Sequence, residues 1–194
     1  MIIRVLLFCL LAPSISVETH AEDIGRFRNP DGTYSLPASA LTDEARRAFV
    51  GGFTYQLRPG WTLKTVPGAA YKMAFGREQD GSPANISFQD VTFNGNLGQF
   101  ETKTIKETAT AYAAQGLTNF KVINMSAFET NANLIGLLAV TQVQRPDGKI
   151  VRQFFYFFER KDGKKVGVVC SVTDAGTTYD AEFDAIMKTF RVTK

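Results

Sequence analysis

Hydrophobic and polar residues alternate from Phe53 onward, and this pattern predicts β-strands. Phe53, Tyr55 and Leu57 alternate with polar neighbours, which is typical of a half-buried strand. The same alternation resumes after the Pro59-Gly60 turn and twice more before residue 92. The further strands predicted in this half are centred on Trp61–Leu63, Tyr71–Phe75 and Ile86–Val91.

The period then changes to that of a helix. Apolar residues recur at roughly helical spacing from Leu97 to Tyr112. Asn96 is a predicted N-cap with Gln99 three residues later, and Gly116 supplies the stop. We therefore expect the main helix of the protein here.

The last third of the chain returns to strands and closes with a second helix. Turn sequences at Pro146-Asp147-Gly148 and Asp162-Gly163 predict antiparallel hairpins. Tyr179, Phe183 and Phe190 share one face of the closing helix. The four predicted strands cover about Phe120–Phe128, Leu134–Val143, Ile150–Glu159 and Val166–Thr173.

One strand sets the architecture. In the run from residue 154 to 158, alternation sends Phe154, Tyr156 and Phe158 to one face, and Phe155 and Phe157 to the other. Both faces are apolar, so both must be covered. The sequence therefore predicts an α+β protein, an α/β/α sandwich with a mostly antiparallel sheet and a helix on each face.

The N-terminus has the pattern of a secretory signal peptide over residues 1–21. Arg4 is followed by the apolar run Val5–Ala12, and Thr19-His20-Ala21 offers small residues around a cleavage point. The apolar run is too short to span a bilayer. We expect an exported protein, periplasmic if the source is bacterial and otherwise secreted.

Residues 22–52 are predicted to form a polar leader before the domain at 53–194. Asn29-Pro30-Asp31-Gly32 marks a turn within it. A short helix is predicted from Thr42, as N-cap, to Phe49.

Removal of residues 1–21 would reduce the number of catalytic and metal-binding side chains in the mature protein. The single histidine, His20, and one of the two cysteines, Cys9, are lost, and the net charge stays +3. Histidine usually supplies the base of nucleophilic catalysis and a ligand of zinc sites. Cys170 lies in an apolar strand and is predicted to be a buried, inert thiol. We expect no cofactor and no histidine- or metal-based enzyme activity.

Carboxylate chemistry remains an alternative, because four acidic residues cluster late in the chain. Asp180 and Asp184 are one helical turn apart and could act as an acid/base pair or hold calcium. First-turn acids that stabilise a helix N-terminus are the simpler interpretation. The cluster consists of Asp174, Asp180, Glu182 and Asp184.

Two features are candidate binding elements. The hairpin carrying Arg160, Lys161, Lys164 and Lys165 concentrates positive charge, which suits an acidic partner or an anionic membrane surface. Its structural interpretation is a solvated hairpin whose lysines resist edge pairing. Nucleic-acid binding is not expected, because no aromatic residue interleaves with the charges. Trp61 is either a core anchor or an exposed contact residue.

Three segments carry a resemblance to a known family: the strand and tryptophan turn of Phe53–Trp61, the hairpin at Pro146–Lys149 with the aromatic strand after it, and the ending Thr189–Val192. Over about residues 53–194 the chain resembles the PsbP-like superfamily. That fold is shared with a Ran-binding nuclear-import factor and with chaperones of type VI secretion effectors. The resemblance implies an α/β/α sandwich with a binding or assembly role, and no catalytic residues.

Three functions follow, in order of preference. The first is an exported, non-enzymatic domain that binds or assembles another protein through a sheet edge, a loop surface or the basic hairpin. The second is a module for a small apolar ligand or lipid, held between the sheet and a helix beside the aromatic strand. The third is a carboxylate- or tyrosine-dependent enzyme.

Overall fold

The computed structural model describes residues 47–50, 53–67, 69, 71–79, 82–173 and 178–192. The predicted signal peptide and most of the leader lie outside these residues. No helix among those described is long and apolar enough to cross a membrane.

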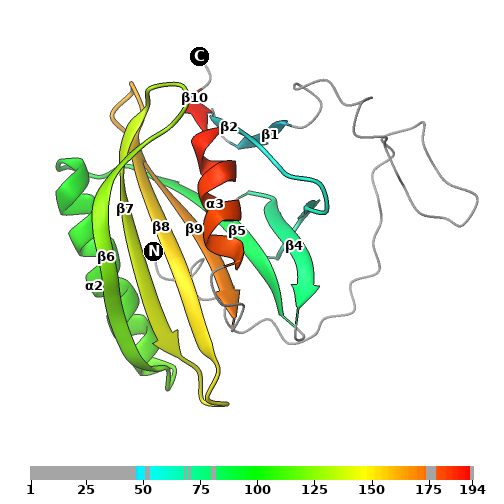
Figure 1. Cartoon of the computed structure of the whole chain (residues 1–194). Helices are drawn as coiled ribbons and strands as arrows, with labels where there is room; N and C mark the ends of the chain where they lie inside the picture. The colour runs from blue at the N-terminus through cyan, green and yellow to red at the C-terminus, as the bar shows by residue number, and fades with distance from the viewer. Residues whose placement is uncertain are drawn as a thin grey trace, which may run out of the picture.

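A seven-stranded antiparallel sheet forms the centre of the fold, with the order β3-β4-β5-β9-β8-β7-β6 (Figure 1). A small second sheet has the order β1-β2-β10. The strands are β1 (Arg47–Val50), β2 (Phe53–Gln56), β3 (Thr62–Lys64), β4 (Met73–Gln79), β5 (Ser82–Val91), β6 (Thr118–Glu129), β7 (Ile135–Gln144), β8 (Ile150–Glu159), β9 (Lys165–Thr173) and β10 (Arg191–Val192). The helices are α2 (Leu97–Ala114) and α3 (Thr178–Lys188).

The two helices cover opposite faces of the sheet, so the predicted α/β/α sandwich is confirmed (Figure 1). Phe154, Tyr156 and Phe158 of β8 pack in one cluster with the apolar residues of α3. Phe155 and Phe157 pack in another with Phe100 of α2. The alternation along β8 therefore supplies both layers of the core, as the pleat of a strand requires.

The predicted helix start at Asn96 is confirmed in detail. The Asn96 side chain accepts from the backbone N–H of Gln99 at 2.9 Å, and the Gln99 side chain accepts from the backbone N–H of Asn96 at 3.0 Å. This reciprocal capping box satisfies two donors that the first turn leaves unpaired. Gly116 follows the helix with a φ of 77°, a conformation that glycine adopts without strain.

The predicted helix at Thr42–Phe49 is wrong where the structure describes it. Arg47–Val50 form strand β1, which pairs antiparallel with β2. Residues 42–46 lie outside the described part. Pairing with the next strand along the chain, which begins at Phe53, has overridden the local helical pattern.

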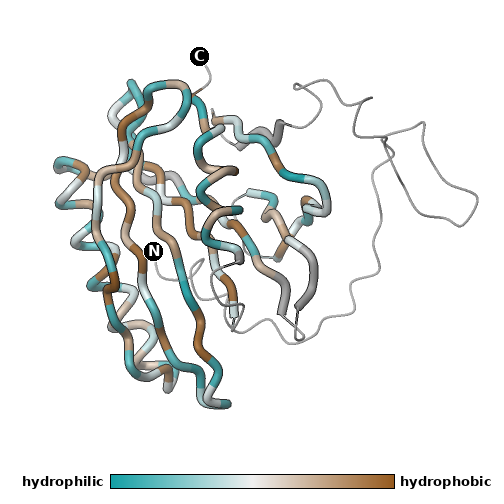
Figure 2. Tube along the Cα trace, in the orientation of Figure 1, coloured by the Kyte–Doolittle hydropathy of each residue, from teal (hydrophilic) through white to brown (hydrophobic). Residues whose placement is uncertain are grey.

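The large sheet has two very different edges. At one edge, β3 has only three residues. At the other, β6 has twelve and is the longest strand in the described structure. Hydrophobic stretches run along the strands between the helices, while the turn joining β7 to β8 is hydrophilic (Figure 2).

Candidate functional site

The outer edge of β6 is the most open part of the described sheet. β6 is last in the strand order and pairs only with β7 among the described strands. Nearly all of its side chains are exposed, and only Phe128 is buried. Its outward backbone N–H and C=O groups therefore face solvent, which is the arrangement that accepts an added strand.

Large apolar side chains are exposed along this edge. Four of the five exposed large hydrophobic residues of the described chain lie on β6 or at the start of β7. A long strand with apolar side chains and no covering element is a typical docking or aggregation surface. The four residues and their exposed fractions are Val122 (43%), Ile123 (54%), Met125 (50%) and Ile135 (69%). We call this set, with the outer edge of β6, the β6 edge.

The register of the hairpin fixes which side chains share a face. Val122 lies opposite Thr141, and Met125 lies opposite Ala139. Ala139 packs in the cluster beneath α2. Val122 and Met125 therefore project to the α2 side of the sheet, since cross-strand partners share a face.

Irregular pairing is confined to the first half of β6. The register shifts between Thr118 and Lys121 and again between Val122 and Asn124. From Asn124 to Glu129 the ladder with β7 is unbroken. Bulges twist an edge and discourage pairing, so Asn124–Glu129 is the half of β6 best able to take another strand.

Contacts with α3 hold the end of β6 in place. The Lys188 ammonium donates a 2.8 Å hydrogen bond to the backbone carbonyl of Glu129 and lies 4.7 Å from the centre of the Phe128 ring. The backbone N–H of Asn131 donates to the carbonyl of Lys188 at 2.8 Å. The β6–β7 turn is thereby tied to the C-terminal end of the helix.

Two of the four cations of the basic hairpin are engaged in ion pairs. Lys165 is only 3% exposed, and its ammonium lies 2.8 Å from the Glu159 carboxylate. The Arg160 guanidinium lies 3.2 Å from Asp162 and 5.3 Å from the centre of the Phe53 ring. Only Lys161 and Lys164 are left as exposed cations of the four. Contact of this hairpin with an anionic membrane or an acidic partner stays a prediction.

Trp61 occupies the core position that the sequence offered as one of its two roles. It is 9% exposed, and its indole N–H donates a 2.8 Å hydrogen bond to the Glu182 carboxylate. Its ring meets Tyr179 and Phe183 of α3 edge-on, with centroids 6.3 and 6.0 Å away. Trp61 anchors the start of β3 against α3.

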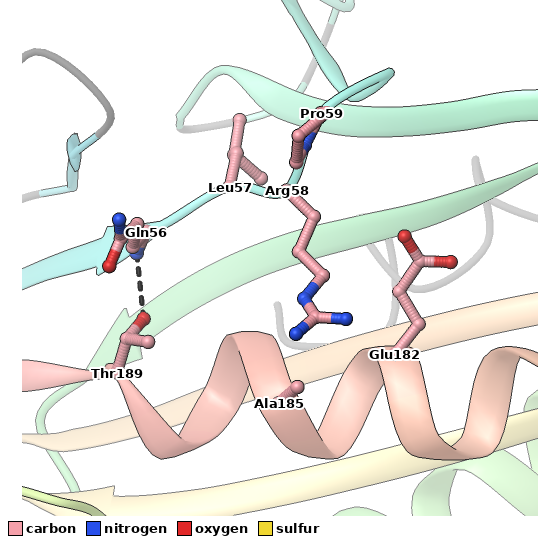
Figure 3. A pocket seen from close by; sticks show the side chains of 7 residues that line it. All are labelled: Gln56, Leu57, Arg58, Pro59, Glu182, Ala185 and Thr189. Carbon is pink, nitrogen blue, oxygen red and sulfur yellow. Dashed lines mark hydrogen bonds between the residues drawn. The ribbon is translucent and has the colours of Figure 1, made fainter. Parts of the chain in front are cut away.

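A cleft of about 410 Å³ lies between the segment after β2 and α3 (Figure 3). Arg58 extends over the helix from one side, and Glu182 rises from the other. A 2.7 Å hydrogen bond from the Gln56 backbone N–H to the Thr189 hydroxyl closes one end. The lining residues are Gln56, Leu57, Arg58, Pro59, Glu182, Ala185 and Thr189. This mixed, charged lining is unlike that of a site for a lipid.

The interior beside the aromatic strand is filled by side chains. On the α3 side, Phe158 stacks on Phe190 at 4.7 Å and Phe154 meets Phe183 at 5.4 Å. On the α2 side, Phe100 meets Phe157 edge-on at 5.6 Å. Core packing therefore accounts for the aromatic strand, and the apolar-ligand hypothesis gains no support from it.

A row of polar side chains crosses the sheet beneath α2. Asn85, Ser171, Gln153 and Thr141 are neighbours in register on four adjacent strands, and all are buried. The Tyr112 hydroxyl donates to the Gln153 side-chain carbonyl at 2.9 Å, and the Gln153 amide donates to the Ser171 hydroxyl at 3.2 Å. The Thr141 hydroxyl makes no hydrogen bond with a protein group.

The helix above this row also presents polar groups to the sheet. Glu101, Thr104 and Thr108 are buried, and each has an oxygen with no hydrogen-bond partner in the protein. Burial raises the pKa of the Glu101 carboxyl above its usual value. The α2 interface is therefore less well satisfied than the aromatic interface of α3.

The late acidic residues have structural partners. Asp180 forms a 2.6 Å ion pair with Arg152, and Glu182 accepts from Trp61. Asp184 is exposed, and Asp174 lies outside the described residues. In the described chain no three His, Cys, Asp or Glu side chains gather as a metal site would require.

The buried tyrosines and the cysteine are poorly placed for proton transfer. Cys170 is a fully buried thiol that forms no disulfide within the described chain, and its predicted burial is confirmed. Burial, together with the charge of Cys170, raises the pKa of Tyr55 and Tyr156 well above the ordinary value. Both hydroxyls therefore stay protonated at neutral pH, which argues against a tyrosine base.

Sequence reasoning named a sheet edge as a binding surface but did not identify β6. The strand itself was predicted, and its mixture of Lys121, Asn124 and Ser126 with apolar residues is a signal of exposure on both faces. The order of strands in the sheet, which makes β6 an edge, is not encoded in any local pattern.

Two solved structures are similar to this chain. The first is cyanobacterial PsbP (CyanoP) from Synechocystis sp. PCC 6803, with a TM-score of 0.56 and 18% identity, covering 75% of this chain and 91% of that one. The second is LpqN of Mycobacterium tuberculosis, described as involved in cell envelope biogenesis, with a TM-score of 0.54 and 14% identity, covering 73% and 83%. No protein-family model and no curated protein sequence matches the chain.

Proposed function

We propose that this chain, which has a PsbP-like fold, is an exported, non-enzymatic accessory domain that binds a polypeptide strand at the β6 edge. The observation that carries the proposal is the twelve-residue edge strand with Val122, Ile123 and Met125 exposed along it. Binding by strand addition uses such an edge for backbone hydrogen bonds and neighbouring pockets or patches for side chains.

The edge is suited to this role because its C-terminal end is tied to α3 and no described strand pairs with its outer side. Lys188 and Asn131 tie its end to α3, so little conformational entropy is lost when a second strand binds. The ladder from Asn124 to Glu129 is regular, which offers about six residues for pairing. A peptide that pairs here also covers the exposed Met125 side chain.

Export is supported by two independent observations. The first 21 residues have the pattern of a cleaved leader. One of the structurally similar proteins, LpqN, is described as acting in cell envelope biogenesis. An accessory role in an exported compartment is consistent with both.

A site-specific photo-crosslink tests the binding surface. Met125 is replaced by a photoreactive phenylalanine derivative in the full chain, expressed with its own leader, and the cells are irradiated. Leu63 is the matched control, because it is an apolar residue, 41% exposed, on the opposite edge strand. We expect a discrete polypeptide adduct from position 125 and none from position 63.

Two outcomes would contradict the proposal. One is the absence of any polypeptide adduct from position 125 in correctly processed protein. The other is an identical adduct pattern from both positions, which would indicate non-specific contact. Far-UV circular dichroism of each purified variant establishes that the fold is retained.

A further inference from the structure

We infer that the cleft between the segment after β2 and α3 binds a small zwitterion of the dipeptide type, whose carboxylate pairs with Arg58 and whose ammonium pairs with Glu182. None of the residues that line the cleft belongs to β6, so this inference does not rest on the proposed function. The volume of about 410 Å³ lies at the small end of the range for ligand sites, roughly 300–1,000 Å³. Such a volume favours a compact ligand.

A tight turn shapes one wall of the cleft. The backbone N–H of Trp61 donates to the carbonyl of Arg58 at 3.2 Å, and Gly60 has a φ of 91°. A proline at the second position and a glycine with positive φ at the third are the pattern of a type II turn. The turn therefore holds the backbone of Arg58 in place, while its side chain is exposed at the cleft.

The opposite wall belongs to α3 and the residue that follows it. Glu182 and Ala185 lie on one side of the helix, and Thr189 continues the same row. One oxygen of the Glu182 carboxylate accepts from the Trp61 indole N–H at 2.8 Å. Its second oxygen has no hydrogen-bond partner within the described chain. The carboxylate is thus held in position and can still accept from a ligand.

The two walls carry opposite charges that do not neutralise each other. The hydrogen bond from Gln56 to Thr189 is the one bond that joins two lining residues (Figure 3). No ion pair joins Arg58 to Glu182, and Arg58 pairs with no other residue that the structure describes. A guanidinium binds a carboxylate through two N–H groups, and a carboxylate oxygen accepts from an ammonium. A ligand with both groups satisfies both walls.

A ligand with a single charge is less well matched to the same cleft. An anion attracted by Arg58 is repelled by Glu182, and a cation attracted by Glu182 is repelled by Arg58. Between the charges the lining is apolar, and it offers contacts to the carbon skeleton of a ligand. The apolar lining residues are Leu57, Pro59 and Ala185. Because Arg58 is exposed, water and salt screen its charge, so we expect a Kd of roughly 1 mM.

The single tryptophan makes binding in this cleft directly observable. Trp61 is the only tryptophan of the chain, so a ¹H–¹⁵N correlation spectrum of the mature protein contains one indole signal. This N–H donates to Glu182, and a cation that pairs with the carboxylate should therefore shift the signal. Titration with glycylglycine should give a saturable shift.

Two analogues of glycylglycine test whether both charges are read. N-acetylglycine keeps the skeleton and the carboxylate but lacks the ammonium. Glycine N-methylamide keeps the ammonium but lacks the carboxylate. Each should bind at least about tenfold more weakly than glycylglycine. Equal affinity for either analogue would show a site for one charge only and would overturn the inference.

Substitutions test the two charged residues. Arg58→Gln removes the guanidinium without touching the bond between Trp61 and Glu182, and it should raise the Kd for glycylglycine roughly tenfold. Glu182→Gln keeps an acceptor for the indole but removes the charge, and it should have a similar effect. Lys106→Gln is the control, because it removes an exposed cation from α2, on the other face of the sheet. It should leave the Kd unchanged.

Two further outcomes would refute the inference. One is the absence of a saturable indole shift at glycylglycine concentrations up to about 100 mM, two orders of magnitude above the expected Kd. The other is an unchanged Kd in Arg58→Gln. An indole signal at its normal position in the ligand-free Arg58→Gln protein establishes that the reporter and its surroundings are intact.

Discussion

The indole N–H of Trp61 donates a 2.8 Å hydrogen bond to the carboxylate of Glu182, a residue 121 positions later in the chain. This bond joins the turn before β3 to α3, and the indole ring also packs edge-on against Tyr179 and Phe183. Trp61, which the sequence offered as a candidate contact residue, is thus part of the packing between α3 and the sheet.

Trp61→Phe should lower the free energy of unfolding by about 1–2 kcal/mol, since it keeps an aromatic ring but removes the hydrogen bond to a charged acceptor. Glu182→Gln retains an acceptor and should cost less. Because the chain has a single tryptophan, urea unfolding should be followed by far-UV circular dichroism and not by fluorescence. Equal stability of Trp61→Phe and the unmodified protein would show that the bond contributes nothing.

Gly136 of β7 lies so close to β8 that a side chain does not fit. A Cβ atom added there would lie 2.5 Å from the backbone carbonyl oxygen of Phe157 and 2.5 Å from the Phe158 ring. Gly136→Ala should therefore destabilise the protein by about 2 kcal/mol or more. The measurement is the midpoint of urea denaturation.

Gly167 of β9 is the control for this substitution. It is also a strand glycine, but a Cβ atom there meets nothing within 4 Å. Gly167→Ala should be neutral or stabilising by up to about 1 kcal/mol, because alanine loses less backbone entropy on folding. Similar losses in both variants would mean that close packing is not the cause.

Thr141 has a hydroxyl that is fully buried and unpaired within the protein. Thr141→Val keeps the shape of the side chain and removes the polar atom, so stability should rise by about 1 kcal/mol. Ser171→Ala, one rung beyond Gln153 in the same row, removes a bonded acceptor and should have the opposite effect. Thermal unfolding of the two variants decides between these signs, and a destabilised Thr141→Val protein would contradict the assignment.

Glu101 should make stability depend on pH. Burial raises the pKa of its carboxyl in the folded state, so the folded protein binds this proton more tightly than the unfolded chain does. The stabilising effect is complete below the unfolded pKa of about 4.3 and is lost as the pH rises through the folded pKa. Glu101→Gln should therefore be more stable than the unmodified protein near pH 7.

The pH profile provides the check on Glu101. Chemical denaturation between about pH 3.5 and 8 should show that the advantage of Glu101→Gln shrinks as the pH falls toward the unfolded pKa of about 4.3. A difference that is the same at every pH would point to packing and not to ionisation.

The two lysines at the end of the basic hairpin should behave differently. Lys165 is buried and paired with Glu159, whereas Lys164 is exposed. Lys165→Met should lower stability by about 1 kcal/mol, since its partner is half exposed and the pair is partly screened. Lys164→Met should change stability by less than about 0.5 kcal/mol. Equal effects on the urea midpoint would remove the distinction.

The core of the fold was predictable because its signals are local. The alternation along Phe154–Phe158 predicted a covered sheet with a helix on each face, and the capping residues Asn96 and Gln99 predicted where α2 begins. Side-chain period and helix caps depend only on neighbouring residues. That the single histidine lies within the predicted leader is likewise read from residue identities alone.

The binding surface was not predictable in the same way, because it depends on long-range arrangement. Strand β1 is an exception, because it pairs with β2 directly after Gly51-Gly52, a local hairpin signal that the helical interpretation missed. The sequence predicted Lys165 to be part of an exposed basic hairpin, but the pairing of β8 with β9 places it beside Glu159. The exposure of Met125 follows from the place of β6 at the end of the strand order.

The three-residue length of β3 limits what this sheet can build. A polymer that grows by sheet addition needs two edge strands able to pair on every subunit, so that each added subunit leaves an open edge for the next. In the described sheet only β6 is long enough to pair stably with another chain, since the three residues of β3 supply too few hydrogen bonds. Growth by this route therefore stops after a single addition, so a long open strand of this kind does not seed fibres.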